Sequence, residues 1–124
     1  MKLANSAFGD FLVRRRTHSN GFDAENRSKY EAARDLWEEA VRLNPFLIDA
    51  YILIGNSHID LDDDMEEAIV WFNRALEVHP DSDLVLSARA AAYELMGEAA
   101  LAKADRQRLI ELDSPFANQP PATP

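Results

Sequence analysis

The amino-acid sequence predicts an all-α protein in which antiparallel pairs of helices stack on one another. Apolar residues recur at helical spacing in several segments, and short breaks that contain proline, glycine or aspartate separate these segments. Single residues also return with a fixed period. The landmarks that recur 34 or 35 residues apart are Ala33, Ala68 and Ala102, together with Pro45, Pro80 and Pro115. Periodicity alone would also suit a plain helical bundle, but landmarks at this interval favour a stack of repeats.

The first predicted helix covers residues 30–44 and the second covers residues 47–60. In the first helix, apolar residues return at helical spacing, and charged residues largely occupy the positions between them. Pro45 cannot continue a helix and biases Asn44 away from helical backbone angles, so the chain is expected to turn there. The stripe along the second helix consists of Tyr51, Ile54, Gly55 and His58.

Three consecutive aspartates, residues 62–64, form a polar break before the third helix, which is expected to start near Asp64. Asp64 and Glu67 have the spacing of a capping box, in which the first side chain accepts a hydrogen bond from the N–H three residues later. His79 and Pro80 end this helix. Two further helices are expected at residues 82–96 and 98–112, with Gly97 in the turn between them because glycine tolerates positive φ.

These landmarks resemble the signature of the tetratricopeptide-repeat family, a 34-residue unit with the pattern W-x2-L-G-x2-Y, then A-x3-F, then P. The central unit follows this pattern, with one extra residue in the aspartate turn and a histidine in one aromatic position. The residues at its pattern positions are Tyr51, Ile54, Gly55, His58, Ala68, Phe72, Ala75 and Pro80. In the first unit only the second helix matches, at Ala33, Trp37, Ala40 and Pro45. The third unit matches less completely, since Arg106 stands where an aromatic residue is expected.

The resemblance implies a right-handed superhelical stack of about three repeats over residues 22–113, the first of them incomplete or irregular. Residues 1–21 are expected to be either a disordered arm or the missing first helix, whose apolar face would consist of Leu3, Ala7, Phe8, Phe11 and Leu12. Residues 114–124 contain four prolines and are expected to form an unstructured tail. The last helix is polar enough to cap the stack, although this face could also bind a partner or a second copy.

Composition limits the function further. The 124 residues include no cysteine, so a disulfide framework, a thiolate zinc site and a cysteine nucleophile are excluded. The net charge is −9, and an acidic surface repels nucleic acid. No segment reaches the roughly 18 apolar residues that cross a bilayer, and the start of the chain does not resemble a secretory signal. A cytoplasmic location without membrane insertion is therefore expected.

No constellation of residues indicates catalysis, and neither a cofactor nor a metal is expected. Asp60, Asp62 and Asp64 have the spacing that opens a calcium-binding loop. However, Met65 and Trp71 stand where such a loop needs glycine and a bidentate glutamate. Negative charge near a helix N-terminus explains these aspartates better. The three histidines lack metal-ligand spacing, and neither a nucleophile–base set nor a glycine-rich loop is visible.

The resemblance also implies a protein-binding surface, because in this family the first helix of each repeat lines a concave groove. Mapped by register, the groove residues of the second unit are Asp49, Ile52, Leu53, Asn56, Ile59 and Asp60, and those of the third are Leu84, Ser87, Ala88, Ala91, Glu94 and Leu95. None of them is cationic, which disfavours the carboxylate clamp of chaperone co-factors in this family. An apolar groove rimmed by acids suits a protein or peptide with apolar anchors and basic flanks.

The sequence therefore predicts a protein–protein interaction module, an adaptor or scaffold, rather than an enzyme. Two alternatives stay open. A dedicated chaperone similar to three-repeat secretion chaperones would hold a client protein in the groove. A structural subunit would form homo-oligomers through the exposed faces of its first or last helices. The chaperone would suppress aggregation of its client, whereas an adaptor would bind a single site and protect nothing.

Overall fold

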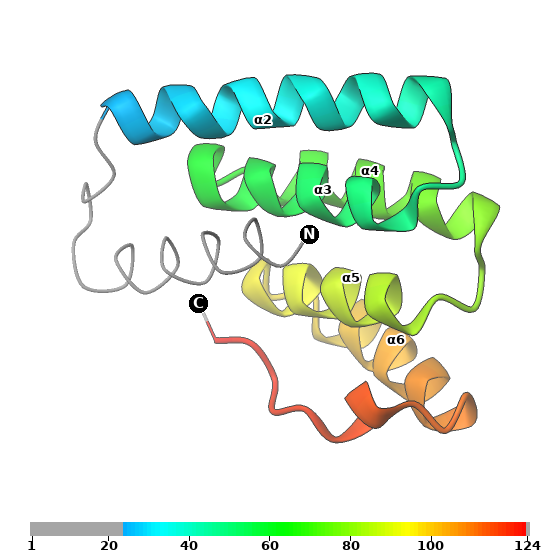
Figure 1. The fold of residues 1–124 in the computed structure, drawn as a ribbon. Helices are drawn as coiled ribbons and strands as arrows, with labels where there is room; N and C mark the ends of the chain where they lie inside the picture. The colour runs from blue at the N-terminus through cyan, green and yellow to red at the C-terminus, as the bar shows by residue number, and fades with distance from the viewer. Residues whose placement is uncertain (1–23, 124) are drawn as a thin grey trace.

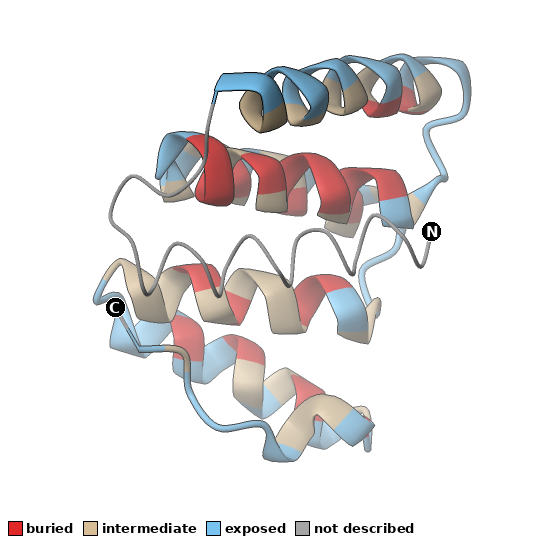
Figure 2. Cartoon of the chain, turned by 60° about the vertical axis from the view of Figure 1, so that its left-hand side comes forward, coloured by how far each residue is buried: buried red, intermediate tan, exposed pale blue. Residues whose placement is uncertain are grey.

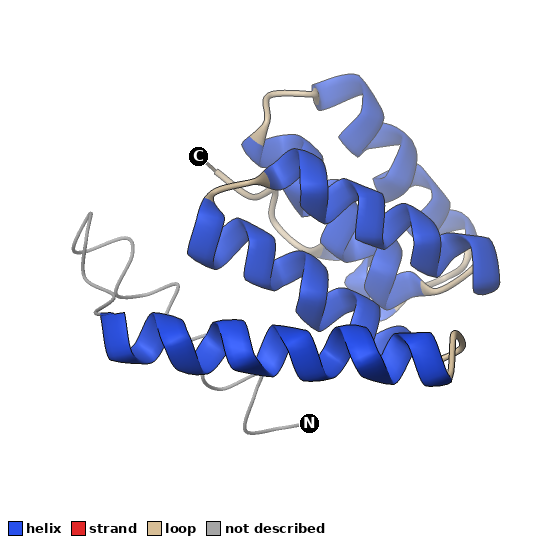
Figure 3. Ribbon diagram, turned by 90° about the horizontal axis from the view of Figure 1, so that it is seen from above, coloured by secondary structure: helices blue, strands red, loops and turns tan. Residues whose placement is uncertain are grey.

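A computed structural model of the protein describes residues 24–123 of the chain. This part of the chain contains helices and connecting segments without a strand, as Figure 3 shows, so the prediction of an all-α protein is confirmed for it. The elements are α2 (Ala24–Leu43), α3 (Ile48–Asp62), α4 (Met65–Val78), α5 (Asp83–Leu95), α6 (Ala99–Glu111) and the short 3-10 helix η1 (Pro115–Asn118). The arm or helix predicted at residues 1–21 lies outside the described residues.

The predicted helices after the first begin and end within about two residues of their observed bounds. The exception is α2, which starts at Ala24 rather than at residue 30. Its additional turns lack the apolar stripe by which a helix is predicted. They are supported instead by charged side chains, since Lys29 Nζ lies 3.4 Å from Glu25 Oε1 one turn away, and Arg27 donates to the Leu61 carbonyl on α3.

The helices follow one another as antiparallel neighbours in one stack. Each α-helix packs against the next one along the chain, and α3 also contacts α5 (Figure 1). Residues with positive φ make two of the short turns, Asp63 at 55° between α3 and α4 and Gly97 at 79° between α5 and α6. Packing between helices that are neighbours in the chain is consistent with stacked helical hairpins.

The core lies around α3, which carries more buried residues than any other described helix (Figure 2). Ile54 on α3 and Phe72 on α4 are completely buried, as are Ala68 and Ala75 beside them. Gly55 lets the two helices approach, because a Cβ atom at this position would lie 2.4 Å from Cε1 of Phe72. Small residues on both helices therefore make room for one large ring, which fills the space between them.

Polar contacts join α6 to α5. Asp105 is buried and accepts two hydrogen bonds from Arg89, at 2.6 Å from Nη2 and 2.8 Å from Nε. Arg106, which departs from the repeat pattern, donates from Nη2 to Glu94 Oε1 at 2.8 Å. Each of the two helices thus supplies one arginine and one carboxylate to these pairs. This pairing allows a polar terminal helix to pack on the stack with few large apolar residues.

The C-terminal segment differs from the unstructured tail that the sequence predicts over residues 114–124. Asp113 adopts a φ of 54° and turns the chain, and Ser114 Oγ caps η1 by accepting a hydrogen bond from the Phe116 N–H. The following residues then run back over α5 and α6 (Figure 1). The prolines that predict disorder also favour an extended chain, and here the extended chain finds hydrogen-bond partners on α5.

We expect Gly55→Ala to lower the free energy of unfolding by about 1–3 kcal/mol, the usual cost of overpacking a core. Helix propensity alone would raise it by up to about 1 kcal/mol, so the sign of the change identifies the clash with Phe72. Urea unfolding followed by circular dichroism measures this change. In a Phe72→Leu background the added methyl group has more room, and the loss should shrink by about half or more. Equal losses in both backgrounds would show that the ring does not set the spacing.

Candidate functional site

Half of the predicted groove residues of α3 are closed off from solvent, while Asp49 is exposed. Leu53 and Ile59 are 2% and 9% exposed and belong to the core cluster, and Asp60 is also buried. Contrary to the prediction, these three residues do not offer an open surface to a partner. Ile52 and Asn56 are half-buried. The reason is the central place of α3, which packs against α2, α4 and α5 and keeps little free surface.

The groove residues predicted on α5 keep more of their surface. Leu84 is 46% exposed. The half-buried residues are Ser87, Ala88, Ala91, Glu94 and Leu95. Two of them contact the chain's own C-terminal segment: Ser87 Oγ donates to Gln119 Oε1 at 2.7 Å, and the Ala122 N–H donates to Glu94 Oε1 at 2.9 Å. The predicted binding face of α5 therefore already contacts an extended piece of polypeptide.

Glu94 lies between two hydrogen-bond donors, the Arg106 guanidinium and the Ala122 N–H. Burial raises the pKa of Glu94, but the hydrogen bonds from these two donors outweigh it and bring the pKa below its ordinary value. The carboxylate is therefore charged at neutral pH and accepts a backbone N–H from a chain that passes over it. The repeat register predicted Glu94 as an acidic residue at the rim of the groove. Nothing in the spacing of the sequence predicted Arg106 as its partner.

Beside the loop that joins α4 to α5 lies a depression of about 500 Å³, lined by Ile48, Asp49, His79, Pro80, Asp81, Ser82 and Leu84. It brings together Asp49 and Leu84, two residues predicted to line the groove from successive helix pairs. Next to it stands Phe46, which is 64% exposed and packs edge-on against His79 with ring centroids 6.4 Å apart. Exposed apolar surface beside a carboxylate fits an apolar anchor that has a basic neighbour.

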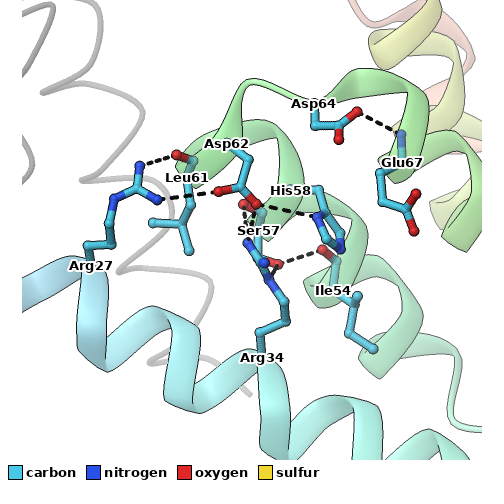
Figure 4. Close-up of polar contacts among 9 residues, drawn as sticks. All are labelled: Arg27, Arg34, Ile54, Ser57, His58, Leu61, Asp62, Asp64 and Glu67. Carbon is cyan, nitrogen blue, oxygen red and sulfur yellow. Dashed lines mark hydrogen bonds and ion pairs between the residues drawn. The ribbon is translucent and has the colours of Figure 1, made fainter.

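A polar network that the sequence did not predict joins α2 to the C-terminal end of α3, as Figure 4 shows. Asp62 Oδ2 accepts a hydrogen bond from Arg34 Nη2 at 2.9 Å and lies 3.5 Å from His58 Nδ1. Its other oxygen accepts from Arg27 Nη1 at 3.3 Å. Arg34 also donates to the buried Ser57 Oγ at 2.8 Å. From the sequence, Asp62 was predicted only as part of a polar turn. Its pairing could not be predicted, because the arginines that pair with it lie far away in the sequence.

The aspartates of this turn belong to separate contacts. Burial raises the pKa of Asp62, but the hydrogen bonds from Arg34 and Arg27 lower it by more, so that it lies below its ordinary value. Asp64 Oδ1 instead accepts from the Glu67 N–H at 3.0 Å and caps α4, which confirms the predicted cap. Among residues 24–123 there is no cluster of three or more carboxylates and imidazoles arranged to hold a metal ion.

We expect Asp62→Asn to lower the free energy of unfolding by roughly 1 kcal/mol at pH 7, because it weakens partly exposed charge-assisted hydrogen bonds. The matched control is Asp35→Asn, which changes an exposed aspartate on α2. It should alter the free energy by less than about 0.5 kcal/mol. Urea unfolding of the three proteins measures both changes. Equal stabilities would show that the contacts of Asp62 do not stabilise the fold.

The lowered pKa of Asp62 also makes its contribution depend on pH. Its pKa in the folded protein lies below the unfolded value of about 3.9, so the stabilisation is present above that value and is lost as the pH falls through the folded-state pKa. The stability difference between wild type and Asp62→Asn should therefore be present above about pH 5 and shrink towards zero at lower pH. Urea unfolding at a series of pH values follows this difference. A difference that persists at pH 2 would contradict the role of the carboxylate.

No protein-family model matches the chain, and no curated protein shows significant similarity to it. Within residues 24–123, no helix combines the length and apolar character needed to cross a membrane.

Proposed function

We propose that this chain is a helical repeat of tetratricopeptide type that binds a segment of a partner protein and acts as an adaptor or scaffold in the cytoplasm. In this role the helices form a right-handed superhelical stack, and the chain carries out no catalytic step. Three features support it. Landmarks recur every 34 or 35 residues, helices pack on their neighbours in the chain, and Gly55 meets Phe72 at two positions of the repeat signature.

The observation that carries the proposal is the depression at which Asp49 and Leu84 meet. Both residues lie near the start of the first helix of a repeat, α3 and α5 respectively. An apolar side chain of the partner would pack against Leu84, and a lysine or arginine next to it would pair with Asp49. From there the half-buried positions Ser87, Ala91 and Glu94 continue along α5, so the rest of the segment would lie along this helix.

A second candidate function is the assembly of identical chains through α2. Leu36 and Leu43 are 72% and 71% exposed, and they lie two turns apart on one side of this helix. Two apolar side chains in this arrangement favour a helix-to-helix contact with a second copy. Sedimentation velocity over a concentration series tests this candidate, which a monomer at every concentration would contradict.

We expect Leu84→Glu to abolish capture of the partner, because it places a charge where an apolar anchor packs. The control is Leu101→Glu on α6, since the two leucines have nearly equal exposure, 46% and 48%. Affinity purification from the native host followed by mass spectrometry identifies proteins that wild type and Leu101→Glu retain but Leu84→Glu loses. Titration calorimetry with the purified partner should then show at least a tenfold loss of affinity, about 1.4 kcal/mol. Equal capture by all three chains would refute the proposed surface.

A further inference from the structure

The C-terminal segment follows α5 from its first turn to its last, on the predicted binding face. Its successive hydrogen bonds join Ser114 to Asp83, Gln119 to Ser87, and Ala122 to Glu94. Both segments therefore run in the same direction, which can be followed in Figure 1 from the start of α5 towards its end. The contact is a continuous one along the helix rather than a single point of attachment.

The spacing of the last two contacts fits an extended chain. Ser87 and Glu94 lie two turns apart on α5, which corresponds to about 10.5 Å along the helix axis. Gln119 and Ala122 lie three residues apart in a segment that rises about 3.1 Å per residue when it is extended like polyproline, or about 9 Å in total. The two distances agree closely, so the segment can lie along α5 without a bend.

The sequence of the segment suits this contact. Gln119 has a φ of −68° and a ψ of 140°, which is the polyproline II conformation. Pro120 and Pro121 restrict φ and carry no N–H. The Ala122 N–H is thus the first backbone donor after the prolines, and it is the one that donates to Glu94. A segment held extended by prolines loses little conformational entropy when it binds.

The contact is also one that a partner can replace. Gln119, Pro120 and Pro121 are exposed, and no side chain of residues 115–123 is buried. Hydrogen bonds to Ser87 and Glu94 hold this part of the segment, with Arg106 Nη1 at 3.5 Å from Gln119 Oε1. A weak contact within one chain still competes with a partner, because the tether gives the segment a high effective concentration.

We propose that residues 119–122 occupy, within their own molecule, a peptide-binding surface formed by Ser87, Glu94 and Arg106. The ligand of this surface in trans is an extended, proline-containing segment of a partner protein, whose backbone N–H replaces that of Ala122 on Glu94. The inference rests on the proposed function, since it names the chemistry of the partner segment and adds that the chain's own segment competes with it. Release of residues 119–122 is then a condition for binding.

The test uses the full chain with Ala122→Pro, which removes the N–H donor and leaves every side chain of α5 and α6 in place. The matched control is Thr123→Pro, which adds a proline next to this donor without removing it. The probe is a fluorescein-labelled peptide with the sequence of residues 115–123, and fluorescence anisotropy measures its affinity. Because a hydrogen bond to a charged acceptor is lost, the Ala122→Pro chain should bind the peptide roughly tenfold more tightly than wild type and the control.

Equal affinities of the three chains for the peptide would overturn the inference, as would a lack of binding to all of them. Circular dichroism should show the same helicity in each chain. Sedimentation velocity separates a contact within one chain from exchange between two copies, and a dimer that dissociates on Ala122→Pro would also overturn the inference. Failure of the proposed function looks different: Leu84→Glu would then lose no partner, while the peptide would still bind the Ala122→Pro chain more tightly.

Discussion

The contact between Gly55 and the Phe72 ring is the constraint on which the rest of the structure depends. Atoms of this ring lie 2.4 to 3.0 Å from the place where a Cβ atom of residue 55 would stand, so only glycine allows α3 and α4 to pack at this distance. Since α3 also contacts α2 and α5, its position against α4 determines where both of these helices can pack. The position of α5 in turn places Leu84 at the same depression as Asp49.

Charge pairing completes the structure where apolar packing is sparse. The described end helices, α2 and α6, each bury only two apolar side chains. Both are joined to the stack by arginine–carboxylate pairs, Arg34 with Asp62 and Arg89 with Asp105. Such pairs are directional, so they fix the rotation of a helix about its axis as well as its distance from its neighbour. Part of the charge of this acidic chain thus holds α2 and α6 in place on the stack.

The helices and turns could be predicted from the sequence because their causes are local. Pro45 and Gly97 each act on the backbone around them. The turn between α3 and α4 ends with Asp64, which caps α4. The burial of Leu53 and Ile59 could not be predicted, because it depends on the helices that surround α3. The partners of Glu94 lie 12 and 28 residues away in the sequence. Likewise, prolines predict disorder or extended binding equally well until a surface for them is known.

The central claim is that a partner segment binds along α5, starting at the depression formed by Asp49 and Leu84. NMR chemical-shift mapping of the isotope-labelled chain with the purified partner segment tests it most directly, because each backbone amide reports separately. We expect the largest shifts at Asp49, Leu84 and Glu94, together with loss of the hydrogen-bonded Ala122 signal as the C-terminal segment is displaced. The largest shifts on the outer faces of α4 and α6, with the Ala122 signal unchanged, would contradict the claim.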